Sequence, residues 1–174
     1  MTNYFIIPGL GNSGPDHWQT HFEQSGPNFT RIQQQEWDAP HCQDWVDNIV
    51  QALQGADLSK VVLIGHSLGC TTIAHLAAQQ NLSIKGAFLV APSDIEQPKY
   101  DFPATGFAPI PTVTLPFPSM VVASSNDEWV SIDRAAYFAR QWGSSFVNIG
   151  EAGHINAVAG FGPWPQGFEL LQQL

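Results

Sequence analysis

A serine, a carboxylate and a histidine that could act together on an acyl group occur in that order along the chain. Ser67 is the centre of the G-x-S-x-G pentapeptide Gly65–Gly69, which directly follows the aliphatic run Val61–Ile64. A serine on a sharp turn between a buried strand and a helix has its hydroxyl exposed at the positive end of the helix. The pattern therefore predicts a nucleophile at Ser67; the alternative interpretation is a strand-to-helix turn without a chemical role.

A serine hydroxyl is a weak nucleophile until a base removes its proton, so one of the six histidines must supply that base. When a serine of this kind belongs to a triad, the acid and then the histidine follow it in the chain. His154 follows the last expected strand in the glycine-flanked loop Gly150–Asn156 and is the predicted base. His17 and His21 have the spacing of a metal-binding pair, but no third ligand is evident, so we expect no metal ion and no cofactor.

The carboxylate that orients the histidine is expected between these two residues in the chain. Asp127 lies on the turn after the expected strand Ser119–Ala123, from which a carboxylate can reach a ring in the loop after the next strand. Glu128 is expected to point the other way, and Asp133 belongs to the following helix. Asp94, at the end of the preceding strand, is the alternative acid, because some hydrolases carry their acid there.

The negative oxygen that forms when a hydroxyl attacks a carbonyl group needs backbone N–H donors. One predicted donor is Leu68, directly after the serine, and the other is Leu10, in the loop Pro8–Gly14 after the first expected strand. The same loop matches the G-x-G-x-x-G pattern of dinucleotide-binding sites. That interpretation is disfavoured because Pro15 delays the following helix, and because it leaves the pentapeptide and the histidine loop unexplained.

Apolar segments of strand length alternate along the chain with amphipathic segments of helix length. The expected strands are Tyr4–Ile7, Phe29–Gln33, Val61–Ile64, Ile84–Ala91, Ser119–Ala123 and Phe146–Ile149. The expected helices are Asp16–Phe22, Cys42–Leu53, Ser67–Gln80, Ser131–Trp142 and Gln166–Leu174. This alternation predicts right-handed crossovers, with the site at the carboxyl ends of parallel strands. We expect one α/β domain over residues 1–174, with a mostly parallel six-stranded sheet in the order 2-1-3-4-5-6, helices on both faces and no cap domain.

Residues 92–118 interrupt this alternation with seven of the thirteen prolines. Proline at this density disfavours helices and central strands, and a long loop inside a compact domain is usually functional. The loop leaves the carboxyl end of the fourth expected strand, so we expect its aromatic side chains to line a substrate pocket. The predicted pocket residues are Tyr100, Phe102 and Phe107 from this loop, together with Trp129. The alternative is an ordered surface loop whose aromatic side chains pack on the core.

The amino-acid composition limits which binding partners and which cellular location we expect. The 174 residues are 44% hydrophobic and 12% charged, as in a globular domain, with a formal net charge of −9. Nucleic acids and anionic membrane surfaces need clustered cations, so neither is an expected partner. Two cysteines are too few for a disulfide framework, and neither a leader sequence nor an apolar run of membrane-spanning length is evident. We expect reduced thiols at Cys42 and Cys70 and a cytoplasmic location.

With these residues placed, the chain resembles the small, lidless α/β-hydrolases of the retinoblastoma-binding-protein-type serine hydrolase family. The resemblance runs nearly end to end, over Pro8-Gly9, His17-Trp18, Trp37, Pro40, Trp45, Gly65–Gly69, Ser124–Asp127, Gly153–Asn156, Gly162 and Trp164. It implies Ser67 as nucleophile, Asp127 as acid and His154 as base. One departure is visible, since the family often has proline after the acid, where this chain has Glu128.

The resemblance also implies hydrolysis of ester, thioester or amide bonds. The aromatic residues and the scarcity of cations favour an uncharged small-molecule acyl substrate of small or medium size. The alternative is a protein-binding module on a hydrolase scaffold in which the three residues are inactive. This alternative stays open because a fold does not fix a function, and because the family's name records a protein-binding role.

Overall fold

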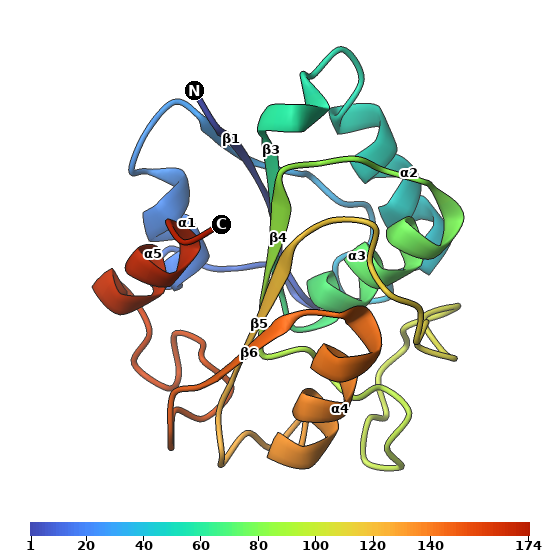
Figure 1. Ribbon diagram of the computed structural model, residues 1–174. Helices are drawn as coiled ribbons and strands as arrows, with labels where there is room; N and C mark the ends of the chain where they lie inside the picture. Colours follow the sequence, from blue (N-terminus) through green and yellow to red (C-terminus); the bar gives the residue numbers. More distant parts are fainter.

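Strand β3, which precedes Ser67, lies near the middle of a six-stranded parallel sheet. The computed structural model describes residues 1–174 (Figure 1). Its strands are β1 (Asn3–Ile7), β2 (Phe29–Arg31), β3 (Val61–His66), β4 (Gly86–Val90), β5 (Ser119–Ala123) and β6 (Ser145–Asn148). Their order is β2-β1-β3-β4-β5-β6 and every neighbouring pair is parallel, which confirms the sheet expected from the sequence.

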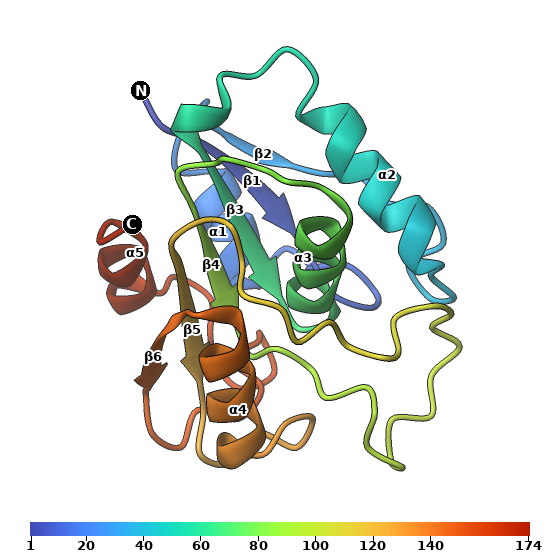
Figure 2. The ribbon, with the colours of Figure 1, turned by 45° about the vertical axis from the view of Figure 1, so that its right-hand side comes forward.

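Helices cover both faces of the sheet (Figure 1 and Figure 2). One face carries α2 (Cys42–Ala52), α3 (Leu68–Gln79) and α4 (Ile132–Trp142), and the other carries α1 (Trp18–Glu23) and α5 (Pro165–Leu171). A single turn of 3-10 helix, Leu58–Lys60, precedes β3. The cysteines in α2 and α3, Cys42 and Cys70, are free and buried. None of the helices combines the length and the apolar character needed to cross a membrane.

The residues of β3 alternate between two apolar cores, because successive side chains of a strand point to opposite faces. Val61 and Leu63 pack in the core under α2, α3 and α4, whereas Val62 and Ile64 pack in the core under α1 and α5. All six residues of the strand are buried. A strand that is buried on both faces has a continuous apolar sequence, and this property made β3 recognisable.

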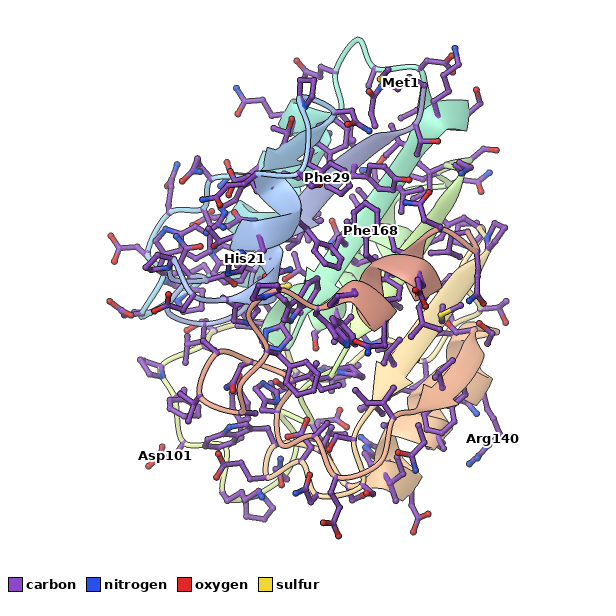
Figure 3. All side chains as sticks on the ribbon, turned by 90° about the vertical axis from the view of Figure 1, so that its left-hand side faces the viewer. Met1, His21, Phe29, Asp101, Arg140 and Phe168 are labelled. Carbon is purple, nitrogen blue, oxygen red and sulfur yellow. The ribbon has the colours of Figure 1, made fainter.

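Figure 3 views the face that α1 and α5 cover, where Phe168 of α5 lies close to Phe29 of β2. The centroids of these two rings are 6.0 Å apart, and Phe168 also packs edge-on against Phe22 of α1 at 5.2 Å. Helix α5 has Pro165 in its first turn, where the missing N–H would have no acceptor in the helix. These contacts attach the last helix to β2 and to α1.

Element boundaries differ from the sequence-based expectation by a few residues. Strand β3 continues through Gly65 and His66, because both still pair with β4. Strands β2 and β4 are shorter than their apolar runs, since pairing with β1 and β3 covers fewer residues. Helix α1 begins two residues later than expected, at Trp18, because His17 serves as its N-cap.

The connection 91–118 between β4 and β5 contains no helix or strand (Figure 2). It is nevertheless anchored to the helices beside it. Nε2 of His75 in α3 donates a hydrogen bond to the carbonyl oxygen of Phe107 at 2.8 Å. The indole N–H of Trp142 in α4 donates to the carbonyl oxygen of Pro111, also at 2.8 Å. The connection is therefore an ordered loop rather than a helical cap.

The turn between β3 and α3 lies against the end of β1. A Cβ atom on Gly69 would lie 2.2 Å from the carbonyl oxygen of Ile7 and 2.8 Å from that of Pro8. A Cβ atom on Gly65 would lie 3.0 Å from the backbone nitrogen of Cys70. Close packing against a neighbouring strand and helix therefore requires both glycines of the pentapeptide.

We predict that Gly69→Ala lowers the free energy of unfolding by about 3 kcal/mol, because the added methyl group overlaps backbone atoms that cannot move aside. Gly14→Ala is the matched control, since a Cβ atom at Gly14 would have no heavy atom within 4 Å. Urea unfolding followed by circular dichroism measures both variants. Equal stabilities of the two would contradict the role of Gly69 in close packing.

Candidate active site

Ser67 occupies a strained turn. Its backbone has φ 55° and ψ −123°, a combination that residues with a Cβ atom rarely adopt. Two hydrogen bonds of 3.0 Å hold it there, from the N–H of Ser67 to the carbonyl oxygen of Val90 and from the N–H of Cys70 to the carbonyl oxygen of Ser67. Ser67 is the N-cap residue of α3, yet its hydroxyl makes no capping hydrogen bond. The hydroxyl is therefore available for chemistry.

Asp127 and His154 form a hydrogen-bonded pair. Nδ1 of His154 lies 2.8 Å from Oδ2 and 3.0 Å from Oδ1 of Asp127. The Asp127 side chain is fully buried, and its Oδ1 also accepts a hydrogen bond from the N–H of Trp129 at 2.8 Å. Because a carboxylate can only accept, Nδ1 carries the proton, and Nε2 of the neutral ring is left unprotonated. A general base needs its ring in this state.

Two buried donors hold the backbone at His154. Nε2 of His66 donates to the carbonyl oxygen of His154, and Nε1 of Trp18 donates to the carbonyl oxygen of Ile155, both at 2.9 Å. Ile155 has a positive φ of 47°, which is strained for a β-branched residue, so this loop needs such support. The histidine of the pentapeptide and the tryptophan at the start of α1 thus fix the backbone that carries the imidazole.

The turn after β5 holds the same loop through side-chain acceptors. Oγ of Ser124 accepts a hydrogen bond from the N–H of Ala152 at 2.9 Å, and Oδ1 of Asn126 accepts one from the N–H of Gly153 at 2.7 Å. Ser124 is fully buried and donates its own proton to Asn126 at 2.8 Å. The segment that carries Asp127 therefore also aligns the loop that carries the histidine.

Ser67 and His154 face one cavity of about 200 Å³. No hydrogen bond joins them in this structure; instead, Oγ of Ser67 lies 2.5 Å from Oγ of Ser93. Ser93 and Asn156 line the cavity and were not identified as site residues from the sequence. A polar residue three positions after the end of β4, at the carboxyl edge of the sheet, was the available signal for Ser93.

Three of the four predicted pocket residues line this cavity. Tyr100, Phe102 and Trp129 pack on one another with ring centroids 4.9 to 5.8 Å apart. Phe107 does not line it, which corrects the expectation. Its side chain is fully buried in the core, edge-on to Trp45 of α2 with the centroids 5.7 Å apart. The ring is completely buried against apolar groups of α2 and α3. Its position in the proline-rich loop could not reveal these contacts.

The two predicted backbone donors lie beside the serine. Leu68 is the first residue of α3, where an N–H group has no acceptor in its own helix. The loop that holds Leu10 approaches the serine closely, since a Cβ atom on Gly9 would lie 2.7 Å from Cβ of Ser67. Leu10 lines the cavity, and its N–H makes no backbone hydrogen bond. Both N–H groups are thus available to a negative oxygen.

Asp94, the alternative acid, has a different partner. Its Oδ2 lies 3.3 Å from Nε of Arg134, which also pairs with Glu96. His154 makes its carboxylate hydrogen bonds to Asp127 alone. The structure therefore brings Asp127, rather than Asp94, to the imidazole.

His17 and His66 are buried side by side, with ring centroids 4.7 Å apart. Burial lowers the pKa of His17 to about 3, with smaller contributions from Arg31 and His154. Burial likewise lowers the pKa of His66 well below its usual value. Nδ1 of His17 accepts a hydrogen bond from the N–H of Gln19 as the cap of α1. Both rings are therefore neutral and structural at pH 7, and no group of three or more His, Cys, Asp or Glu side chains could hold a metal ion.

Proteins of known structure share this arrangement of strands and helices. A family model described as "Serine hydrolase" matches residues 4–173. The structure is similar to that of a YdeN-like hydrolase from Pectobacterium atrosepticum, with 38% identity, a TM-score of 0.88 and coverage of 99% of this chain and 90% of that chain. The ydeN gene product from B. subtilis is 20% identical, with a TM-score of 0.74 and coverage of 99% and 98% of the two chains.

A more distant neighbour is Est1E from Butyrivibrio proteoclasticus, in a structure with bound ferulic acid. It is 16% identical, with a TM-score of 0.68 and coverage of 99% of this chain and 89% of that chain. At this identity, and at that of the ydeN gene product, the similarity establishes the fold alone. No curated protein matches the sequence.

We predict that the free energy of unfolding falls as the pH is lowered from 6.5 toward 3. His17 has a pKa of about 3 in the folded protein and the usual value of 6.5 when unfolded, so the unfolded chain binds the extra proton in this range. At pH 5 the loss from this residue is about 2 kcal/mol. His17→Asn removes the titrating ring and keeps a capping oxygen, so it should reduce the pH dependence.

His41→Asn is the matched control for this substitution, because it removes an exposed histidine from the N-cap of α2. Urea unfolding at pH 7 and at pH 5 gives the loss for each protein. If wild type, His17→Asn and His41→Asn all lose the same free energy between the two pH values, the buried ring of His17 is not responsible.

Proposed function

The chain belongs to the serine hydrolase family, whose model matches residues 4–173, and we propose that it hydrolyses an acyl ester, thioester or amide through Ser67. The observation that carries this proposal is the contact of both carboxylate oxygens of Asp127 with Nδ1 of His154, at a cavity that Ser67 also lines. A buried carboxylate on Nδ1 prepares Nε2 to accept a proton. In a serine hydrolase, the proton that this nitrogen accepts comes from the hydroxyl of the serine in the strained turn, which here is Ser67.

In the acylation step, a lone pair of Ser67 Oγ forms a bond to the substrate carbonyl carbon while Nε2 of His154 takes the hydroxyl proton. The carbonyl π electrons move to oxygen, to which the N–H groups of Leu10 and Leu68 donate hydrogen bonds. When the tetrahedral intermediate collapses, the bond to the leaving group breaks and His154 gives the proton to that group. The negative charge of Asp127 stabilises the imidazolium between these two transfers.

In the deacylation step, water takes the place of the leaving group. Nε2 of His154 removes a proton from the water molecule as its oxygen bonds to the acyl carbon. Collapse of the second tetrahedral intermediate breaks the bond to Ser67 Oγ, which recovers its proton from His154. The same two backbone donors stabilise the negative oxygen in both steps. No further group is needed to complete the cycle.

The lining of the cavity supports an uncharged acyl substrate of small or medium size. The cavity has a volume of about 200 Å³, and no lysine, arginine, aspartate or glutamate lines it. Tyr100, Phe102 and Trp129 supply apolar walls, while Ser93 and Asn156 supply polar groups. Apolar walls with a few polar groups are typical of sites for small molecules.

We predict that a fluorophosphonate probe labels the folded protein and that Ser67→Ala abolishes the labelling, because the probe reacts with an activated serine hydroxyl. Fluorescence of the protein band after electrophoresis measures the product, and wild-type protein unfolded by heat is the control. If the folded wild-type protein is not labelled, the chain is better explained as a protein-binding module that has kept the hydrolase fold.

Asp127→Asn should lower kcat/KM for p-nitrophenyl acetate by about four orders of magnitude, because an amide can stabilise the wrong tautomer of His154. Asp94→Asn is the matched control, since it makes the same change in a carboxylate that pairs with Arg134. Initial rates at pH 7.5 compare the two variants with wild type. A large loss in Asp94→Asn with a near-normal rate in Asp127→Asn would reassign the acid to Asp94.

A further inference from the structure

The hydroxyl of Ser93 is the hydrogen-bonding partner of the nucleophile in this structure. Oγ of Ser93 lies 2.5 Å from Oγ of Ser67, and Ser93 is only 1% exposed. Both hydroxyls line the cavity that His154 faces. The mechanism above assigns no role to Ser93, although a buried hydroxyl in contact with the attacking oxygen affects its position and the direction of its proton.

Ser93 approaches the nucleophile from the side opposite to the predicted backbone donor of Leu10. In the sheet, β3 lies between β1 and β4. Leu10 follows β1, and Ser93 follows β4, so the two residues reach Ser67 from different neighbouring strands. The contact between the two Oγ atoms places the Ser93 hydroxyl on the serine oxygen itself.

Counting protons and lone pairs gives the direction of the hydrogen bond between the two serines. Oγ of Ser67 has one proton and two lone pairs, and the proposed reaction sends that proton to Nε2 of His154. The contact with Ser93 can coexist with this transfer only if Ser93 donates its proton to a lone pair of Ser67.

Backbone contacts tie Ser93 to the acid of the site. The N–H of the next residue, Asp94, donates to the carbonyl oxygen of Trp129 at 2.9 Å. The N–H of Trp129 in turn donates to Oδ1 of Asp127 at 2.8 Å. The segment that holds Ser93 is thus fixed to the segment that holds Asp127, so its hydroxyl has a defined position relative to the His154 ring.

We propose that Ser93 is a positioning residue that donates a hydrogen bond to Oγ of Ser67 and thereby directs the Ser67 proton to His154. This inference rests on the proposed function. It requires no new bond to the substrate: the Ser93 proton stays on Ser93 while the Ser67 proton passes to Nε2 of His154.

The test is the second-order rate of fluorophosphonate labelling, which reports attack by Ser67 without a deacylation step. Ser93→Ala should slow labelling by about tenfold, the effect of one lost hydrogen bond on a barrier. kcat/KM for p-nitrophenyl acetate should fall by the same factor with KM unchanged. The midpoint of the pH–rate profile should not move, because Ser93 does not contact the imidazole.

Ser119→Ala is the matched control. Ser119 also pairs with a serine, with its Oγ 2.6 Å from Oγ of Ser144, but this pair is only partly buried and lies at the start of β5, outside the site. Its removal should cost similar stability in thermal unfolding and leave the labelling rate at the wild-type value.

Two results would overturn the inference while leaving the proposed function intact: Ser93→Ala labels at or above the wild-type rate, or its pH–rate midpoint moves. Loss of labelling in Ser119→Ala equal to that in Ser93→Ala would also overturn it, because the effect would then follow from lost stability. Failure of the wild-type protein to react would instead refute the proposed function.

Discussion

The hydrogen bonds between the carboxylate of Asp127 and Nδ1 of His154 join the two loops on which the site depends. These loops leave β5 and β6, which are neighbours in the sheet, so their carboxyl ends lie next to each other. The carboxylate is fully buried, and a buried charge without partners would be strongly unfavourable. The imidazole and the N–H of Trp129 therefore stabilise the fold as well as prepare the ring for chemistry.

The nucleophile and the base both lie on backbone that is under strain. Ser67 and Ile155 have positive φ values, and each such residue costs about 1–3 kcal/mol. Neither loop keeps its conformation by itself. Val90 of β4 accepts a hydrogen bond from the serine turn, and Trp18 donates to the carbonyl oxygen of Ile155. The strain persists because these hydrogen bonds to neighbouring elements hold both turns in place.

The sequence predicted best what depends on burial and chain order. Strand β5 ends where expected because its apolar run is buried on both faces, and Asp127 was preferred because it follows that strand. Two features of the site could be recognised only from contacts in the folded structure. Phe107 lies in the same connection as Phe102, yet its side chain joins the core because α2 offers it an apolar surface. The contact of Ser67 with Ser93 joins the ends of two strands, and no local pattern encodes the rotamers that make it.

The first variable position of a G-x-S-x-G pentapeptide is usually treated as open to any residue. In this chain His66 fills it, with a neutral ring whose N–H reaches the carbonyl oxygen of His154. One peptide bond separates that anchor from the nucleophile. A small displacement of the end of β3 would therefore carry the serine and the histidine loop along together. The distance between Ser67 and His154 therefore changes little when the end of β3 moves. A substitution of His66 must preserve the hydrogen bond to His154 as well as the sharp turn.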